Sequence, residues 1–172
     1  SIWMDRFDPV EAVRLIGERE ASVFMGVPTL YQRLLSLPEE EEWGLGSMRL
    51  FTSGSAPLPA AIHEAFTART GHRILERYGM TEAGIVLSNP YEGLRKPGAV
   101  GFPVCGAEVG VFGSAGEPLP QGEVGEIRMR GPSVVRGYLG RPAQTAASFA
   151  GGWLRSGDLG SIDADGYFRI AG

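Results

Sequence analysis

Hydrophobic residues in the first half of the chain follow helical and strand periods in turn. Segments 8–20, 28–37 and 58–70 repeat apolar residues at helical spacing and predict helices. The first opens with Asp-Pro, a common helix start, and Gly71 closes the third. Short apolar runs predict strands between the helices, at 21–27, 48–54 and 73–79. Because strand and helix alternate, we expect parallel β-α-β units.

The second half has a different pattern, in which short alternating segments are separated by turns rich in Gly and Asp. The predicted strands are 107–113, 122–131 and 160–170, and only 143–150 predicts a helix. The DADG sequence at 163–166 is typical of a hairpin turn. We therefore expect an α/β plus β fold. A βαβ parallel-sheet subdomain over 1–92 precedes a smaller antiparallel, barrel-like β subdomain over 93–172.

Composition narrows the classes of function. The 26 glycines and 12 prolines favour many short strands over a helix bundle. The net charge is −4 and no basic block exceeds two residues, which argues against a nucleic-acid partner. Cys105 is the only cysteine, so an internal disulfide and a cysteine-rich zinc site are excluded. With no signal peptide and no apolar run near 18 residues, we expect a cytoplasmic protein without a membrane partner.

Candidate chemistry lies where the predicted parallel strands end, because ligands of open α/β sheets bind beyond the carboxyl ends of strands. The segments at or after the ends of the three predicted strands are 26–28, 52–57 and 78–82. The second of these, TSGSAP, offers small residues that let the backbone approach a flat ring closely. It lacks the Gly-Lys-Ser/Thr end of a P-loop, and it is equally well interpreted as a plain strand, turn and helix entry.

The third strand end, RYGMTEAG at 77–84, carries the most specific signal. Thr81 and Glu82 add nothing to turn geometry, but a hydroxyl suits a phosphate and a carboxylate suits the magnesium that accompanies it. Tyr78 adds an aromatic face for a base. The bend therefore predicts a nucleotide site.

Four ordered motifs resemble the adenylate-forming superfamily of acyl-CoA synthetases, peptide-synthetase adenylation domains and luciferases. They are RYGMTEAG, GEIRMRGPSVVRGYLGRP, GGWLRSGDLG and DGYFRIAG. Further segments resemble malonyl-CoA or methylmalonyl-CoA synthetases: VPTLYQRLL, RLFTSGSAPL, GHRILERYGMTE and LSNPYEGLRKPGAVG. The resemblance implies that a small carboxylic acid attacks the α-phosphate of ATP with Mg2+, giving an acyl-adenylate, and that coenzyme A then takes the acyl group.

The resemblance also implies roles for individual residues. Tyr78 corresponds to the aromatic residue that stacks on adenine, and Asp158 to the carboxylate that accepts the ribose hydroxyls. Thr81 and Glu82 correspond to the catalytic pair, Thr81 contacting the α-phosphate and Glu82 the metal. The remaining nucleotide-binding positions are Gly54, Ser55, Ala56 and Gly79, of which the first three form the wall between adenine and the acyl pocket.

Arg33, Ser55 and Met80 are the predicted acyl-pocket residues. The guanidinium of Arg33 can grip the distal carboxylate of malonate with two hydrogen bonds, and Met80 can limit acyl length. The alternatives are a solvent-facing Arg33, as most helix arginines are, and a Met80 that only packs in the core.

The resemblance implies that the chain is the central part of a large domain, with N- and C-terminal parts of the same enzyme missing. These would hold the pyrophosphate loop, the hinge and the catalytic lysine, so we expect the chain alone to be inactive. Lys96, the only lysine, is expected to be a surface loop charge. His63 is expected on an exposed helix face.

Two other classes of function stay open. One is an adenylation domain that activates an aryl, fatty or amino acid for a carrier protein. The other is a non-catalytic nucleotide-binding or structural module. The presence of Tyr78, Thr81, Glu82 and Asp158 together argues against the second.

Overall fold

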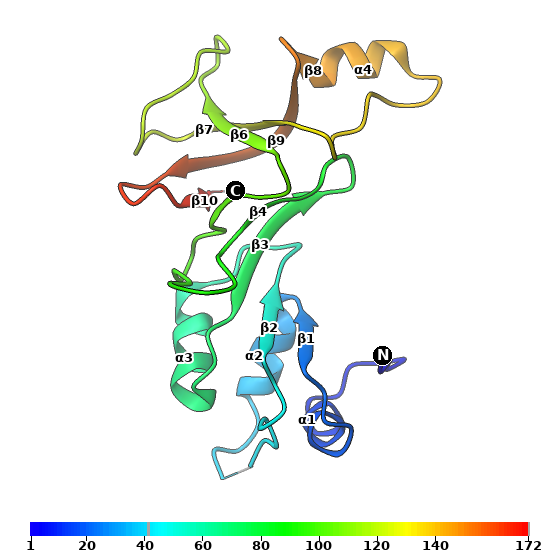
Figure 1. Cartoon of the computed structure of the whole chain (residues 1–172), viewed down its shortest axis with the longest axis vertical. Coiled ribbons are helices and arrows are strands. Elements are labelled where there is room, and N and C mark those ends of the chain that lie inside the picture. Colours follow the sequence, from blue (N-terminus) through cyan, green and yellow to red (C-terminus); the bar gives the residue numbers. More distant parts are fainter. Residues whose placement is uncertain (41, 172) are drawn as a thin grey trace. The chain divides into compact units, whose positions relative to one another are not determined.

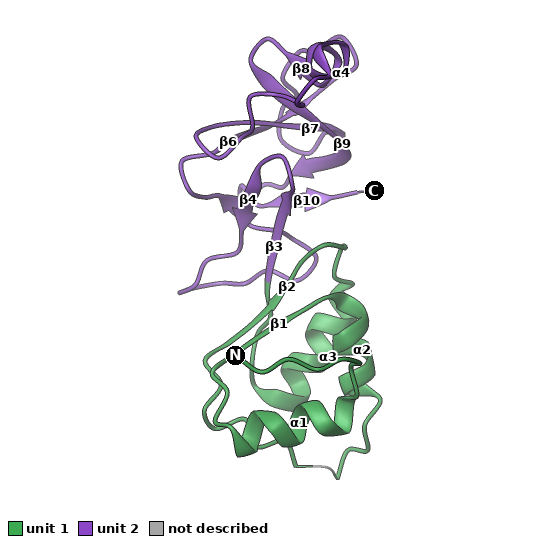
Figure 2. Cartoon of the chain, turned by 90° about the vertical axis from the view of Figure 1, so that its right-hand side faces the viewer, with its two compact units in different colours: residues 1–75 green, residues 76–172 purple. Residues whose placement is uncertain are grey.

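The computed structural model describes residues 1–40 and 42–171 and divides into two compact units, Ser1–Leu75 and Glu76–Gly172 (Figure 2). The sequence places the subdomain boundary later, between 92 and 93. The units divide earlier because the segment after Glu76 pairs with strands that follow it along the chain. Across the described residues, the helices lack the combined length and apolar character needed to cross a bilayer.

The first unit contains helices and parallel strands in alternation (Figure 1). Its helices are α1 (Pro9–Glu18), α2 (Pro28–Leu35) and α3 (Ala60–Thr70), and its strands are β1 (Val23–Gly26) and β2 (Leu50–Ser53). Strands β1 and β2 are parallel, with Val23 opposite Leu50 and Gly26 opposite Ser53. The predicted β-α-β arrangement of this unit is therefore confirmed.

Aromatic rings form the centre of the first unit. Tyr31, Phe51 and Phe66 are almost fully buried. The Phe66 ring packs edge to face against both of the others, with centroid distances of 5.1 Å to Tyr31 and 4.9 Å to Phe51. The buried Tyr31 hydroxyl donates to the Thr52 carbonyl at 2.7 Å, so its polar end is satisfied.

His63 corrects a prediction. It lies on α3 with 2% of its surface exposed, whereas the sequence predicts an exposed position. His63 and Phe66 are three residues apart and share the inward face of α3, which places the imidazole inside the unit.

The regular structure of the second unit consists of antiparallel strands and the short helix α4, joined by long loops. One sheet contains β3 (Leu75–Met80), β4 (Gly84–Ser88) and β5 (Phe102–Pro103), which pair in sequence order. The other has the order β10-β9-β7-β6, with β8 pairing on β9. Its elements are β6 (Glu108–Phe112), β7 (Gly125–Arg130), α4 (Pro142–Ser148), β8 (Phe149–Ala150), β9 (Trp153–Ile162) and β10 (Phe168–Ile170). The expected antiparallel half, and with it the predicted fold class, is confirmed.

The inward face of this second sheet is apolar. Ile127, Met129 and Leu154 have no exposed surface and alternate with polar residues such as Arg128 and Arg155 on the opposite face. Strand β4 is absent from the sequence expectation, and the predicted helix at 143–150 ends at Ser148, where the chain enters β8.

Lys96, which the sequence predicts to be a surface loop charge, lies half-buried in the loop before β5 and is paired with two carboxylates. Its Nζ lies 2.6 Å from an Asp163 carboxylate oxygen and 2.7 Å from one of Asp165, in the turn between β9 and β10. The Nε of Arg169 lies 3.3 Å from the same Asp163 oxygen. The loop before β5 is therefore tied to the predicted DADG turn by a network of charges.

Candidate nucleotide-binding site

The bend at 77–84 is the tip of the β3–β4 hairpin. Strand pairing shifts register between Tyr78 and Gly79. A Cβ atom at Gly79 would overlap the backbone carbonyl of Gly84, so only glycine fits where the two strands approach. The hairpin turns immediately afterwards, leaving Thr81 exposed and Glu82 half-buried at its tip. The predicted phosphate and metal residues thus lie at an accessible turn of the hairpin.

Tyr78 and Asp158, which are 80 residues apart in the sequence, are joined directly. The Tyr78 hydroxyl donates to Asp158 Oδ2 at 2.6 Å. Burial, and next the hydrogen bond to the Asp158 carboxylate, raise the pKa of the Tyr78 hydroxyl well above its usual value. Tyr78 therefore stays neutral as a donor, and its bond fixes the direction of the carboxylate, while Asp158 Oδ1 accepts no hydrogen bond from residues 1–40 and 42–171.

The segment around Asp158 is a distorted part of strand β9, which begins at Trp153, earlier than the predicted strand at 160–170. Strand β9 pairs Arg155 with Arg128 and Leu159 with Glu126, so residues 156–158 lie opposite Ile127 alone. This is a β-bulge, a device that turns a side chain away from the regular alternation.

Two features hold the bulge in shape. Gly157 has a φ of +80°, a left-handed conformation that glycine adopts without strain. The Ser156 hydroxyl donates to the Ile127 carbonyl at 2.6 Å and accepts the Asp158 N–H at 3.0 Å. The bulge therefore directs Asp158 toward Tyr78.

Glu82 is held by Tyr138, a residue that the sequence does not single out. The Tyr138 hydroxyl donates to Glu82 Oε1 at 3.0 Å, and the Glu82 carbonyl accepts the Val135 N–H at 2.8 Å. Both partners come from the segment between β7 and α4, which carries the GPSVVRGYLGRP part of a quoted motif. The motif indicates that this segment matters, but the spacing of residues along the chain does not reveal that it contacts Glu82.

The Glu82 carboxylate suits a magnesium ion that is held mainly by nucleotide phosphates. Magnesium is typically bound by one or two carboxylates together with substrate phosphates and water. Among residues 1–40 and 42–171, no group of three or more His, Cys, Asp or Glu side chains forms a complete metal cage. A single half-buried carboxylate beside an exposed Thr81 hydroxyl fits the first arrangement and not the second.

Of the other predicted residues, Met80 is half-buried at the end of β3 in the second unit, and the rest belong to the first unit. Gly54 is buried directly after β2, and Ser55 and Ala56 are exposed. Ser55 has a φ of +67°, a left-handed conformation that is strained for a non-glycine residue and recurs at functional sites. Arg33 is exposed on α2, with its guanidinium carbon 5.1 Å from the Phe7 ring centroid. The roles of Met80 and of these residues toward a substrate stay predictions.

The model of the family described as AMP-binding enzyme matches residues 1–139. The chain belongs to this family.

Several relatives are similar over nearly the whole chain. The ATP-bound crystal structure of MatB from Rhodopseudomonas palustris superposes with a TM-score of 0.93 at 46% identity, covering 99% of this chain and 34% of that one. A malonyl-CoA ligase in a ternary product complex with methylmalonyl-CoA and AMP gives a TM-score of 0.86 at 42% identity, over 97% of this chain and 36% of that one. The long-chain-fatty-acid–CoA ligase of Bacillus subtilis is 38% identical over 99% of this chain and 31% of its own length. The chain thus spans about a third of these relatives.

Proposed function

We propose that this chain is the central part of an ATP-dependent acyl-CoA synthetase that uses malonate or methylmalonate. The observation that carries the proposal is the Tyr78–Asp158 pair beside the Thr81–Glu82 turn, in a member of the AMP-binding enzyme family. The relatives named as CoA ligases support the acid–thiol ligation.

The proposed reaction needs mostly positioning and charge neutralisation, because the substrate carboxylate is itself the nucleophile. Tyr78 would stack on adenine, and Asp158 would accept a ribose hydroxyl through the oxygen that Tyr78 leaves available. Thr81 would donate its hydroxyl to the α-phosphate, and Glu82 would hold the magnesium. When bound, the metal supplies positive charge to the phosphates. These contacts fix the α-phosphate for attack by the acid, before coenzyme A takes the acyl group.

The malonate assignment rests on two supports. One is similarity to MatB and to the malonyl-CoA ligase that binds methylmalonyl-CoA. The other is Arg33, whose guanidinium lies on the exposed face of α2 and can pair with a second carboxylate. Among the described ion pairs, none involves Arg33, whose guanidinium packs against the Phe7 ring and is not paired with a carboxylate.

A longer acid is the second candidate substrate. The Bacillus subtilis relative is named a long-chain-fatty-acid ligase and matches 99% of this chain at 38% identity. The two candidates differ in what Arg33 does, since a fatty acid has no second charge to pair with.

The test is acyl-CoA formation by the full-length protein that contains this chain, with malonate, methylmalonate, butyrate and a long-chain fatty acid as substrates. Arg33→Met should lower kcat/KM for malonate by up to about fivefold, because an exposed ion pair between a guanidinium and a carboxylate contributes up to about 1 kcal/mol. Butyrate should be spared. Arg19→Met, which removes an exposed charge at the end of α1, is the matched control. Equal losses for malonate and butyrate would make Arg33 a packing residue, and a wild-type preference for long-chain acids would overturn the malonate assignment.

A further inference from the structure

The segment between β7 and α4 contacts Glu82 twice. Val135 donates its N–H to the Glu82 carbonyl, and Tyr138 donates its hydroxyl to Glu82 Oε1. One bond fixes the backbone of the hairpin tip and the other fixes the end of the side chain. Glu82 Oε2 accepts no hydrogen bond from the residues that the structure describes.

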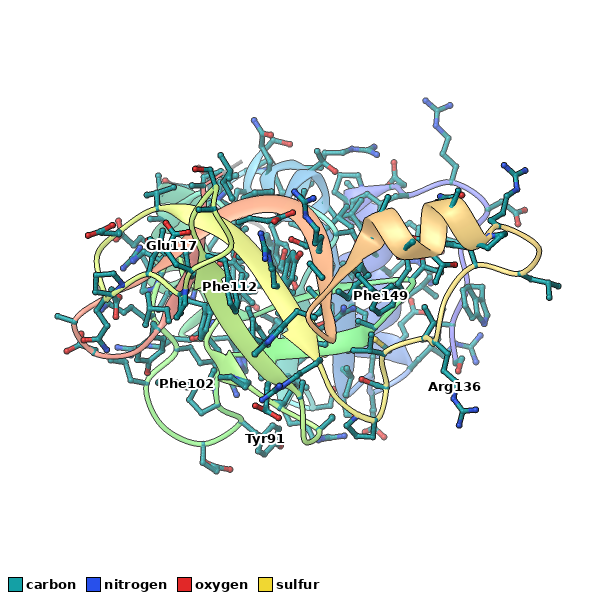
Figure 3. All side chains as sticks on the ribbon, turned by 90° about the horizontal axis from the view of Figure 1, so that it is seen from above. Tyr91, Phe102, Phe112, Glu117, Arg136 and Phe149 are labelled. Atoms are coloured by element: carbon teal, nitrogen blue, oxygen red, sulfur yellow. The ribbon has the colours of Figure 1, made fainter. Side chains whose placement is uncertain are left out.

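Tyr138 is itself held in place by helix α4. Its backbone N–H donates to the Thr145 hydroxyl of α4 at 2.9 Å. Gly137, with a φ of +150°, lies so close to Thr145 that a Cβ atom would stand 2.5 Å from its methyl group and 2.8 Å from its hydroxyl. Any side chain at Gly137 would therefore push the segment away from α4. The neighbouring Arg136 points outward from the segment (Figure 3).

We propose that Tyr138 is a positioning residue that sets the orientation of the Glu82 carboxylate for the metal-bound nucleotide. The proposal deepens, and rests on, the proposed function of Glu82. Tyr138 binds Oε1, which leaves Oε2 without a hydrogen bond from the described residues, and Thr145 with Gly137 fixes the position from which the phenol reaches the hairpin tip. This gives the RGYLGRP part of the motif a physical role.

A purely structural role would not require this geometry. A glutamate at a hairpin tip is well solvated without a partner, and the backbone bond from Val135 already secures the tip. A carboxylate that ligates a metal benefits from a neighbouring donor, because the donor restricts the rotamer and fixes which oxygen faces the ion. Loss of such a donor typically lowers metal affinity by about 10- to 100-fold.

The test measures equilibrium binding and not turnover. Mn2+ replaces Mg2+, and its electron paramagnetic resonance signal reports binding with a non-hydrolysable ATP analogue to the full-length protein. Tyr138→Phe keeps the ring and removes the hydroxyl, and should weaken Mn2+ binding about tenfold. Tyr167→Phe removes a hydroxyl that donates to the Leu94 carbonyl, and should leave Mn2+ binding unchanged. Thr145→Val removes the acceptor behind Tyr138, and should weaken Mn2+ binding in the same direction.

The possible outcomes separate this inference from the proposed function. If Glu82→Gln loses Mn2+ binding and both Tyr138→Phe and Thr145→Val match wild type, Tyr138 does not position Glu82 and the inference is overturned while the metal site stands. If Glu82→Gln itself binds Mn2+ as wild type does, the proposed role of Glu82 fails and the inference falls with it. If Tyr138→Phe does not fold, Thr145→Val decides by the same criterion.

Discussion

Replacing Asp158 tests the nucleotide site most selectively. Asp158→Ala removes the carboxylate that the β9 bulge directs toward Tyr78, and Asp158→Asn keeps its shape but removes its charge. Because the Tyr78 hydroxyl already occupies Oδ2 at 2.6 Å, the structure leaves chiefly Oδ1 for the ribose. One charge-assisted hydrogen bond contributes roughly 1.5–3 kcal/mol. Asp158→Ala should therefore weaken ATP binding by about one to two decades.

Tyr78→Phe is the companion variant, because it keeps the ring that would stack on adenine and removes only the donor to Asp158. We expect it to weaken ATP binding by less than about fivefold, since the carboxylate stays charged and only its orientation loosens. Isothermal titration of the full-length protein with ATP measures both changes, and urea unfolding of each variant separates loss of the site from loss of the fold.

Two results would refute this reasoning. Unchanged ATP affinity in Asp158→Ala would mean that the ribose is held elsewhere. A Tyr78→Phe variant that binds ATP as weakly as Asp158→Ala would mean that the pair acts through its mutual bond and not through a contact from Asp158 to the ribose.

Three further predictions concern other parts of the molecule. Glu82→Gln keeps the side-chain shape but removes its charge, so acid-dependent pyrophosphate exchange should be lost while the circular dichroism spectrum stays that of wild type. If the variant exchanges pyrophosphate at the wild-type rate across a magnesium titration, Glu82 has a structural role only. Gly79→Ala should lower the free energy of unfolding in urea by about 2 kcal/mol or more, because the added Cβ meets the Gly84 backbone. Gly46→Ala adds a Cβ in open space and is the control; equal urea midpoints for the two variants would contradict the close approach at Gly79. Burial of the Asp163 carboxylate acts to raise its pKa, but hydrogen bonds from Lys96 and from backbone N–H groups hold the pKa below its usual value. The ionised carboxylate therefore stabilises the fold above about pH 4, and this contribution is lost as the pH falls through the lowered pKa. Asp163→Asn should therefore flatten the acid side of the stability curve, and a variant with the wild-type acid slope would argue against this linkage.

Local sequence patterns predicted the elements of the first unit. Helix α1 begins where Asp-Pro predicts, with the Asp8 carboxylate accepting the Glu11 N–H at 2.9 Å, and α3 ends at Gly71, whose φ is +74°. Such signals are short-range, since a cap or an αL residue acts on its own turn of helix. The antiparallel half was likewise visible in its alternation and in the DADG turn.

The sequence could not predict contacts that join distant segments. Tyr78 and Asp158 are 80 residues apart, and Lys96 and Asp163 are 67 apart, so no local period links them. The sequence does not predict strand β4, because its five residues begin at the last residue of the RYGMTEAG motif and no Gly- or Pro-rich segment separates them from it. Resemblance to a family suggested which residues matter, while the bulge in β9 and the contact from Tyr138 to Glu82 needed coordinates.

The most direct test of the central claim is acid-dependent exchange of labelled pyrophosphate into ATP by the full-length protein. Exchange requires reversible formation of an acyl-adenylate, so it reports the adenylation step separately from coenzyme A transfer. We predict exchange that depends on malonate or methylmalonate and on magnesium, and that disappears in Glu82→Gln. Absence of exchange with every acid tested, or release of ADP in place of pyrophosphate and AMP, would contradict the assignment of this chain to an adenylate-forming synthetase.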